Sequence, residues 1–216
     1  VYTSTAINNT DNIIRKIDST GNETWSFNGG FTGRIQSNIE TDSNDNVYTN
    51  DTDNNLKKID TNGNEVWTFN GVENFILVNN QYIIASDYNN SFNPFGALRK
   101  IDLSGNEIWS KGFHDGVVLI LKSDLSGNVY SGGADNTVRK IDPDGNEIWT
   151  FSGHTDRIYH IAVDSNDNVY SGSNDNTVKK IDSSGNEVWT FSEHTNRIRG
   201  VAVDLNGNVY SGSSYD

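Results

Sequence analysis

The chain has 216 residues, of which 33% are hydrophobic, and its 29 acidic residues against 16 lysines and arginines give a formal net charge of −13 at pH 7. This length is enough for one compact domain or two small ones, and the acidic surface disfavours nucleic acid and anionic membranes as partners. No apolar run approaches the ~18 residues that a membrane-spanning helix needs. The chain has no cysteine, which excludes disulfides and thiolate chemistry, and its lack of methionine indicates a processed form or a piece of a longer protein.

Internal repetition dominates the sequence. The phrase Lys-Ile-Asp-x-x-Gly-Asn-Glu-x-Trp recurs with small variations, and its tryptophans are spaced by 40 or 42 residues, at Trp25, Trp67, Trp109, Trp149 and Trp189. We therefore divide one domain, residues 1–216, into repeats of about 1–46, 47–82, 83–128, 129–168, 169–208 and a partial 209–216. A period of this length is typical of a β-propeller.

Each repeat is expected to form short strands, because its hydrophobic pattern has period two and its segments are rich in Gly, Asn and Asp. In the last full repeat the strands are predicted at Val169–Ser171, Thr177–Ile181 and Glu187–Phe191, followed by Ile198–Val203. Four antiparallel strands per repeat predict an all-β propeller of about five blades, with six or more as the alternative.

The turn before each tryptophan supports this prediction. Its Asp-x-x-Gly sequence places glycine where a type I turn with a bulge needs a positive φ, at Gly21, Gly63, Gly105, Gly145 and Gly185. A three-residue loop would set Lys179 opposite Trp189, and Ile181 opposite Glu187. The recurring tryptophans are interpreted as structural side chains buried between blades.

Two family resemblances follow from these motifs. Gly153–Ile158, Ala162–Asp164 and Tyr170–Val178 resemble a WD-repeat blade, although Ile141-Asp142 and Ile181-Asp182 stand where that family has Trp-Asp. The tryptophan that follows Asp-x-x-Gly is similar to the tryptophan-docking repeat of quinoprotein propellers. The resemblance to these WD40-like and PQQ-like repeats implies a propeller fold, and it implies little about function.

Three histidines occupy equivalent places in successive repeats: His114, His154 and His194. The WD-repeat resemblance implies that such a histidine bonds the aspartate of the following turn, which is Asp135 after His114 and Asp175 after His154. We interpret these histidines as structural.

No signature of catalysis or of a cofactor was found. The Asp-rich segments 42–46 and 51–55 lack the glycine and glutamate of an EF-hand loop and are expected to be solvated hairpins. Five basic pairs, among them Arg139-Lys140 and Lys179-Lys180, hold a fixed place in the third strand and therefore indicate blade packing. We expect no enzyme activity, no cofactor and no metal.

A specific binding site is expected where the repeats differ. One such place is the insertion at residues 87–96, which carries Tyr88, Phe92 and Phe95. The other is the strand that is expected to line the centre of a propeller, where the side chains at roughly corresponding positions vary from repeat to repeat and include Tyr159, His160 and Arg199. Aromatic and charged side chains of this kind suit protein or carbohydrate contacts, although the insertion also fits a simple cover for a blade edge.

We therefore expect a non-enzymatic module that presents a rigid face to a protein or glycan, on the cell surface or outside the cell. The alternative is a structural subunit, a scaffold whose edge strands self-associate, and a propeller enzyme ranks third. Strand counting bears on this choice, because the Val-Tyr strand occurs six times and the tryptophan strand five. Pairing of Ile198–Val203 with Val1–Thr5 would indicate a five-bladed ring, whereas pairing with Val209–Ser213 and a strand from elsewhere would favour the subunit.

Overall fold

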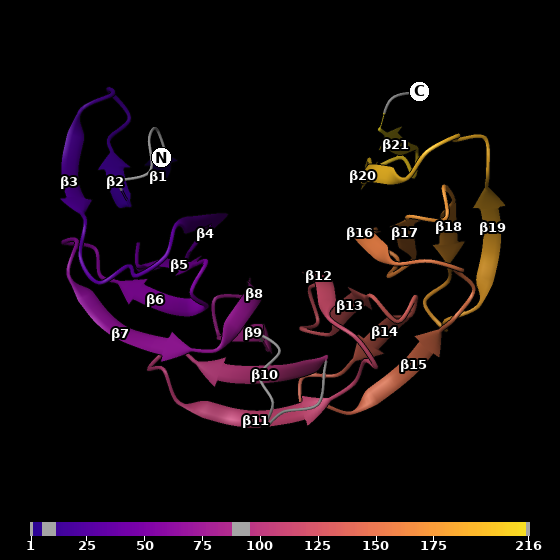
Figure 1. Cartoon of the computed structure of the whole chain (residues 1–216), viewed down its shortest axis with the longest axis horizontal. Coiled ribbons are helices and arrows are strands. Elements are labelled where there is room, and N and C mark those ends of the chain that lie inside the picture. The colour runs from indigo at the N-terminus through magenta and orange to yellow at the C-terminus, as the bar shows by residue number, and fades with distance from the viewer. Residues whose placement is uncertain (1, 6–11, 88–95, 215–216) are drawn as a thin grey trace. The chain divides into compact units, whose positions relative to one another are not determined.

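The computed structural model describes residues 2–5, 12–87 and 96–214, which form strands joined by turns (Figure 1). Within this part of the chain, no helix is long and apolar enough to cross a membrane. All regular elements of the described residues are strands, so the all-β prediction is confirmed. Contacts group the chain into two compact units, Val1–Tyr88 with Lys100–Ile108, and Asn89–Arg99 with Trp109–Asp216. The assignment of all residues to one domain stays a prediction.

The first unit contains a three-stranded sheet and a four-stranded sheet, and it contributes most of a second four-stranded sheet. The three-stranded sheet is β1 (Tyr2–Thr5), β2 (Ile13–Ile17) and β3 (Glu23–Phe27). The next is β4 (Ile35–Thr41), β5 (Val47–Asp51), β6 (Asn55–Ile59) and β7 (Glu65–Asn70). The following sheet is β8 (Val72–Val78), β9 (Tyr82–Asp87), β10 (Ala97–Asp102) and β11 (Glu107–Gly112), and its last two strands include residues of both units.

The second unit repeats the arrangement. One sheet is β12 (Val118–Ser123), β13 (Val129–Gly133), β14 (Val138–Ile141) and β15 (Glu147–Phe151). The next is β16 (Ile158–Val163), β17 (Val169–Ser173), β18 (Val178–Ile181) and β19 (Glu187–Phe191). The described chain finishes with a two-stranded sheet, β20 (Ile198–Val203) and β21 (Val209–Ser213). The four-stranded antiparallel repeat is thus as predicted.

The glycine turns also agree with the prediction. All five glycines of the Asp-x-x-Gly turns have φ between +76° and +93°. One register was wrong, however, because Lys180 and not Lys179 lies opposite Trp189, while Ile181 does lie opposite Glu187. A bulge between Lys180 and Ile181 leaves Val188 unpaired and moves the indole by one residue.

This register places three side chains of each sheet in a row across neighbouring strands. Tyr170 on β17 lies opposite Lys180, which lies opposite Trp189, and the same row occurs in the other complete sheets that share the Val-Tyr sequence. The Lys180 ammonium lies 5.3 Å from the Tyr170 ring centroid. In four of the five basic pairs the preceding residue instead bonds a glutamate of the last strand, as Lys179 does with Glu187 at 3.1 Å. The basic pairs therefore belong to blade packing, as predicted.

Neighbouring sheets are joined through the tryptophans. The Nε1 of Trp149 donates a hydrogen bond to the Ser183 carbonyl oxygen in the next turn, at 3.1 Å, and a Cβ added to Gly185 would lie 2.9 Å from the indole. Trp25, Trp67 and Trp109 contact the following sheets in the same manner, with Nε1 bonds to Thr61, Leu103 and Pro143. All five indoles are half-buried. The tryptophans therefore dock one sheet on the next, and only glycine leaves room for the ring.

The two ends of the chain pair within their own sheets. β20 pairs with β21, from Ile198 opposite Ser213 to Val203 opposite Val209, whereas Tyr2–Thr5 pairs with β2. The pairing of Ile198–Val203 with Val1–Thr5 that the five-bladed ring requires is therefore absent from the described residues. The number of blades stays open.

Candidate functional site

The strands of each sheet alternate in direction, so the connections fall on two edges. One, the turn edge, carries the connections between first and second and between third and fourth strands. The other, the loop edge, carries the connection between second and third strands and the loop that leads to the next sheet. Nine of the described turn-edge connections share an Asp-x-x-x-Asn sequence, and the one between β8 and β9 does not. The loop edge varies from sheet to sheet.

On the turn edge the aspartates are occupied by their own turns. In each Asp-x-x-x-Asn turn the Asp backbone N–H bonds the Asn carbonyl oxygen, and one carboxylate oxygen accepts N–H groups two and four residues later. Such turns begin at Asp18, Asp42, Asp60, Asp102, Asp124, Asp142, Asp164, Asp182 and Asp204. The backbone N–H of Asn22 and the Thr20 hydroxyl lower the pKa of Asp18 to about 2.

These bonds leave little for a cation to bind. The segment at 42–46 is a hairpin turn, as expected, but its Asp42 is buried and not solvated, because the carboxylate also accepts a hydrogen bond from the Tyr48 hydroxyl at 2.9 Å. In the segment at 51–55, Asp51 is likewise buried and accepts the N–H groups of Asp53 and Asn55. No group of three metal-ligating side chains occurs among the residues that the structure describes.

On the loop edge, His114 and His154 each connect the loop before a first strand to the turn after the second strand of the same sheet. The Nδ1 of His154 lies 2.8 Å from Asp175 Oδ2, and its Nε2 lies 2.8 Å from Ser171 Oγ. Since a carboxylate only accepts, Nδ1 donates to Asp175, and Nε2 of the neutral ring accepts from the serine hydroxyl. Thr177 completes the network by donating to Asp175 at 2.7 Å. The preceding sheet repeats it with His114, where Nδ1 lies 2.9 Å from Asp135 and Nε2 lies 2.7 Å from Ser131.

The same hydrogen bonds lower the pKa values of the aspartates. Burial alone would raise the pKa of Asp175, but the bonds from His154 and Thr177 outweigh burial and hold that pKa well below its usual range. The carboxylate is therefore charged at neutral pH and fixes the loop to the turn. His194 retains the equivalent bond to Ser211, at 2.8 Å. The position equivalent to Asp175 is Tyr215 in the sequence, outside the described residues.

The candidate binding residues fall into two groups. Tyr88, Phe92 and Phe95 lie outside the described residues. The other three lie on first strands of the second unit. Tyr159 and His160 of β16 are half-buried, and Arg199 of β20 is exposed, with its Nε donating to Ser214 Oγ at 2.6 Å.

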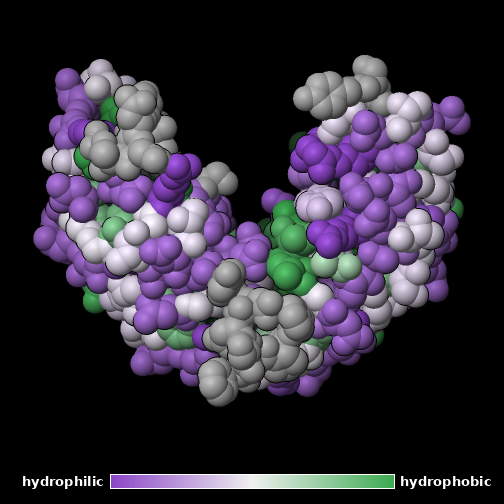
Figure 2. Space-filling view, viewed as in Figure 1, coloured by the Kyte–Doolittle hydropathy of each residue, from purple (hydrophilic) through white to green (hydrophobic). Residues whose placement is uncertain are grey.

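The first strands of the second unit have both charged and hydrophobic surroundings. Burial, followed by the positive charge of Lys122, lowers the pKa of His160. Figure 2 shows a small hydrophobic patch near β12 on a face that is otherwise mostly hydrophilic. His160 is therefore suited to apolar contact and hydrogen bonding in its neutral form.

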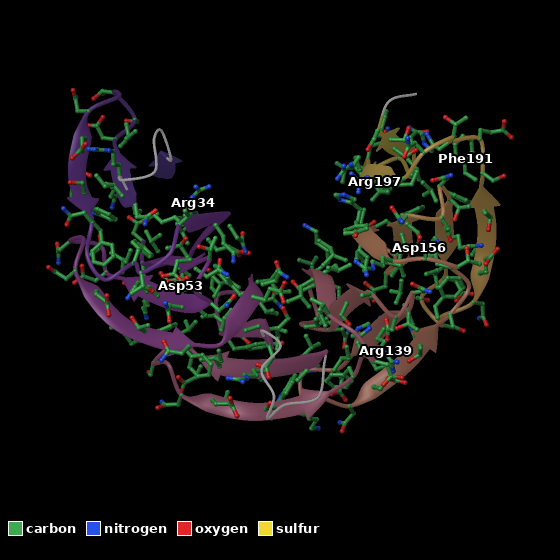
Figure 3. The ribbon with its side chains drawn as sticks, in the orientation of Figure 1. Arg34, Asp53, Arg139, Asp156, Phe191 and Arg197 are labelled. Atoms are coloured by element: carbon green, nitrogen blue, oxygen red, sulfur yellow. The ribbon has the colours of Figure 1, made fainter. Side chains whose placement is uncertain are left out.

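Sequence reasoning missed two arginines on the loop edge. Arg157 and Arg197 occupy equivalent positions in successive repeats, and neither guanidinium has a hydrogen bond or ion pair among the described residues. Beside Arg157, Asp156 is fixed by Asn174, whose Nδ2 donates to its carboxylate at 2.7 Å. Figure 3 labels Asp156 and Arg197 on this part of the second unit. Their recurrence in the Thr-x-Arg-Ile sequence was the available signal.

The comparisons with known proteins agree with this geometry. The family described as WD domain, G-beta repeat matches residues 145–182, which span the turn of β14–β15 to the end of β18. No curated protein matches the chain. The predicted resemblance to WD repeats is thereby confirmed, and it supports a propeller of the kind that serves protein interaction, generally without catalysis.

Proposed function

We propose that the chain is a protein-interaction module that binds its partner through the loop edge of the second unit. The observation that carries this proposal is the contrast between the two edges. Turn-edge carboxylates are occupied by their own turns, while the loop edge presents Arg157 and Arg197 with no partner among the described residues.

The loop edge has the rigidity that recognition needs. The His154 network ties the loop before β16 to the turn after β17, and the N–H of Asn174 also bonds the Arg157 carbonyl oxygen at 2.9 Å. A loop fixed in this manner loses little conformational entropy on binding. Arginine is also among the residues that most often carry binding energy in protein interfaces.

The chemistry of the edge favours a protein partner with carboxylates. Free guanidinium groups bind carboxylates in a bidentate manner, and the neighbouring Asp156 disfavours a polyanion such as nucleic acid. Tyr159 and Arg199 lie on the first strands next to the loop edge and extend the same surface. Glycan binding, the other partner expected from the sequence, rests on aromatic residues that mostly lie outside the described residues.

Site-specific photocrosslinking tests the proposal. A photoreactive phenylalanine analogue at Thr155 on the loop edge should crosslink a protein in lysate of the source cells, whereas the same analogue at Asn166 on the turn edge should not. Both positions are exposed. The crosslinked protein is then purified, and its affinity for the chain is measured with Arg157→Ala and with the turn-edge control Asn166→Ala.

We expect Arg157→Ala to weaken binding at least tenfold and Asn166→Ala to leave it unchanged. Equal crosslinking from both edges, or equal effects of the two alanine variants, would refute the loop edge as the binding surface. A glycan array that bound the chain while no protein was crosslinked would replace the protein partner with a carbohydrate.

A further inference from the structure

The chain contains four Asn-Gly sequences, and they differ in the hydrogen bonding of the glycine. They are Asn28-Gly29, Asn62-Gly63, Asn70-Gly71 and Asn206-Gly207, and all four asparagines are exposed. The backbone nitrogen of such a glycine can attack the side-chain amide of the preceding asparagine, because glycine has no Cβ to obstruct the approach. A nitrogen whose N–H is held in a hydrogen bond must first be released by local opening. The reactivity of each asparagine therefore depends on the N–H group that follows it.

Two of the four sequences lie in Asp-x-x-x-Asn turns that hold this N–H group. The Gly63 N–H donates to the Asp60 carbonyl oxygen at 3.0 Å, and the Gly207 N–H donates to the Asp204 carbonyl oxygen at 3.0 Å. In both turns the aspartate carboxylate also accepts the backbone N–H of the reactive asparagine itself. Ring closure would break these bonds, so both asparagines are protected although they are exposed to solvent.

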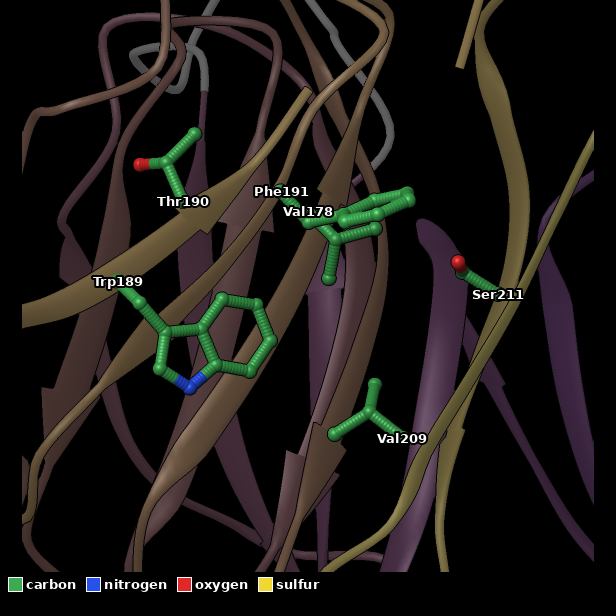
Figure 4. A pocket seen from close by; sticks show the side chains of 6 residues that line it. All are labelled: Val178, Trp189, Thr190, Phe191, Val209 and Ser211. Carbon is green, nitrogen blue, oxygen red and sulfur yellow. The ribbon is translucent and has the colours of Figure 1, made fainter. Parts of the chain in front are cut away.

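The turn at Gly207 separates hydrogen bonding from burial. It leads into β21, whose Val209 and Ser211 line a pocket of 360 Å³ beside Trp189 (Figure 4). A Cβ on Gly207 would have nothing within 4 Å. The Gly207 N–H nevertheless stays bonded within the turn, so an open environment does not by itself free the nitrogen.

The other two sequences form a matched pair at the end of the last strand in consecutive repeats. Their motifs are Trp-Ser-Phe-Asn-Gly at residues 25–29 and Trp-Thr-Phe-Asn-Gly at residues 67–71, and both glycines are half-buried. The Gly71 N–H donates to the Asn54 carbonyl oxygen at 2.8 Å. Neither the Gly29 N–H nor the side chain of the preceding asparagine makes a hydrogen bond among the described residues. The two motifs therefore share their sequence and burial and differ in the state of the nitrogen.

The connection after β3 is longer than the one after β7. Residues 28–34 join β3 to β4, whereas Gly71 alone joins β7 to β8. The Thr32 N–H, farther along the longer loop, donates to the Asp51 carboxylate at 3.3 Å. Between β3 and this bond the loop contains two consecutive glycines, so the Gly29 nitrogen can turn toward the asparagine side chain without the unfolding of a sheet.

We propose that Asn28 is a site of spontaneous deamidation in the folded chain, and that hydrogen bonds protect the other three Asn-Gly sequences. The Gly29 nitrogen attacks Cγ of Asn28 and forms an N–Cγ bond. The Cγ–Nδ2 bond breaks, and ammonia leaves with the proton of the Gly29 N–H. Water then opens the succinimide ring at either carbonyl group and leaves aspartate or isoaspartate at position 28.

Either product changes the loop edge of the first unit. A carboxylate replaces a neutral amide and adds negative charge to a chain that is already acidic. Isoaspartate also routes the main chain through its Cβ, which inserts a carbon atom into the backbone between Phe27 and Phe31. The rings of these two residues pack edge to face, with centroids 5.5 Å apart. Deamidation would therefore alter the loop that joins the first two sheets.

Peptide mapping of the full chain measures the rate at each site. The folded chain and the chain unfolded in urea are kept in the same mildly alkaline buffer, and mass spectrometry follows loss of the amide in each Asn-Gly peptide. In the folded chain we expect Asn28 to deamidate at least tenfold faster than Asn70. In urea the two matched motifs should deamidate at similar rates, because unfolding removes the hydrogen bond that distinguishes them.

Two variants test the chemistry and the protection. Asn28→Gln should remove most of the isoaspartate that enzymatic carboxyl methylation detects in the aged folded chain, since glutamine would have to close a larger ring. Asp60→Ala removes the carboxylate that accepts the Asn62 and Asn64 N–H groups, so deamidation at Asn62 should rise while that at Asn28 stays unchanged. Circular dichroism checks the fold of each variant, and the wild-type comparison needs neither of them.

The proposal fails if any of the other three asparagines deamidates as fast as Asn28 in the folded chain. It also fails if Asn28 leads by the same factor in urea, because the local sequence and not the fold would then set the rate. An Asn62 rate that stays unchanged in folded Asp60→Ala would contradict protection by the turn.

Discussion

The contact between Trp149 and Gly185 offers a direct measure of how neighbouring sheets hold together. We consider the change Gly185→Ala. Gly185 has φ +91°, and an alanine held in this left-handed conformation costs about 1–2 kcal/mol. The new Cβ would also lie 2.9 Å from the Trp149 ring, closer than real carbon contacts allow, so the indole must move.

Movement of the indole adds to the loss of stability. Forcing an extra methyl group into a packed contact costs about 1–3 kcal/mol, and loss of the Trp149 bond to Ser183 costs about 1 kcal/mol. We therefore expect Gly185→Ala to lower the free energy of unfolding by about 3–6 kcal/mol. Gly207→Ala, which bears the strain without the collision, should lower it by only about 1–2 kcal/mol.

Denaturant unfolding followed by tryptophan fluorescence measures both losses. The decisive comparison repeats Gly185→Ala in a Trp149→Ala background, where only the strain remains, so that the two changes together should cost at least ~1 kcal/mol less than their sum. Equal losses for the two glycine variants, or strict additivity with Trp149→Ala, would show that the indole does not hold the sheets together.

Three further predictions concern buried polar groups. Hydrogen bonds lower the pKa of Asp175 in the folded state, so its contribution to stability is present above the unfolded pKa of ~3.9 and is lost as the pH falls below it. The melting temperature of Asp175→Asn should therefore fall less between pH ~5 and pH ~2 than that of the wild type. An unchanged pH profile would contradict the network. Ser171→Ala should lower the free energy of unfolding by about 1–3 kcal/mol, because it leaves the buried His154 Nε2 without a partner. Ser211→Ala should lower it less, because Ser211 is partly exposed. Calorimetry measures both losses, and a larger loss for Ser211→Ala would contradict this reasoning. Burial, followed by charge and hydrogen bonding from nearby carboxylates, raises the pKa values of Tyr48 and Tyr130. Both should therefore stay protonated until the protein unfolds above pH ~10. Absorbance at 295 nm follows tyrosine ionisation, and smooth ionisation of all nine tyrosines in the folded protein would refute this prediction.

The parts of the structure that the sequence predicted are those in which one residue type has one physical reason to be present. A glycine after Asp-x-x needs a positive φ, and a histidine placed two strands before an aspartate turn finds that aspartate as its partner. The register of Trp189 could not be derived in the same way. It depends on the bulge beside Val188, and neither the hydrophobic period nor the length of the turn determines whether that bulge forms.

Depth of burial and binding residues were also harder to predict. The indoles are half-buried and not largely buried. Four of them lie over the turn of the following sheet, so that one side of the ring packs inward and the other stays partly exposed. Arg157 and Arg197 occupy equivalent positions in successive repeats, and an equivalent position by itself indicates a structural role. Only the structure shows that neither guanidinium makes a hydrogen bond or ion pair among the described residues.

Docking of each tryptophan on the following turn has a consequence for how this chain can change in length. Trp25, Trp67, Trp109 and Trp149 each dock on the glycine turn of the sheet that follows. An added or deleted internal repeat would therefore create or remove one whole contact and leave the others unaltered. Stability is then close to a sum over adjacent pairs. Gene duplication or loss of a single repeat would thus yield a chain that still folds, and selection could adjust the size of the protein without redesigning its core.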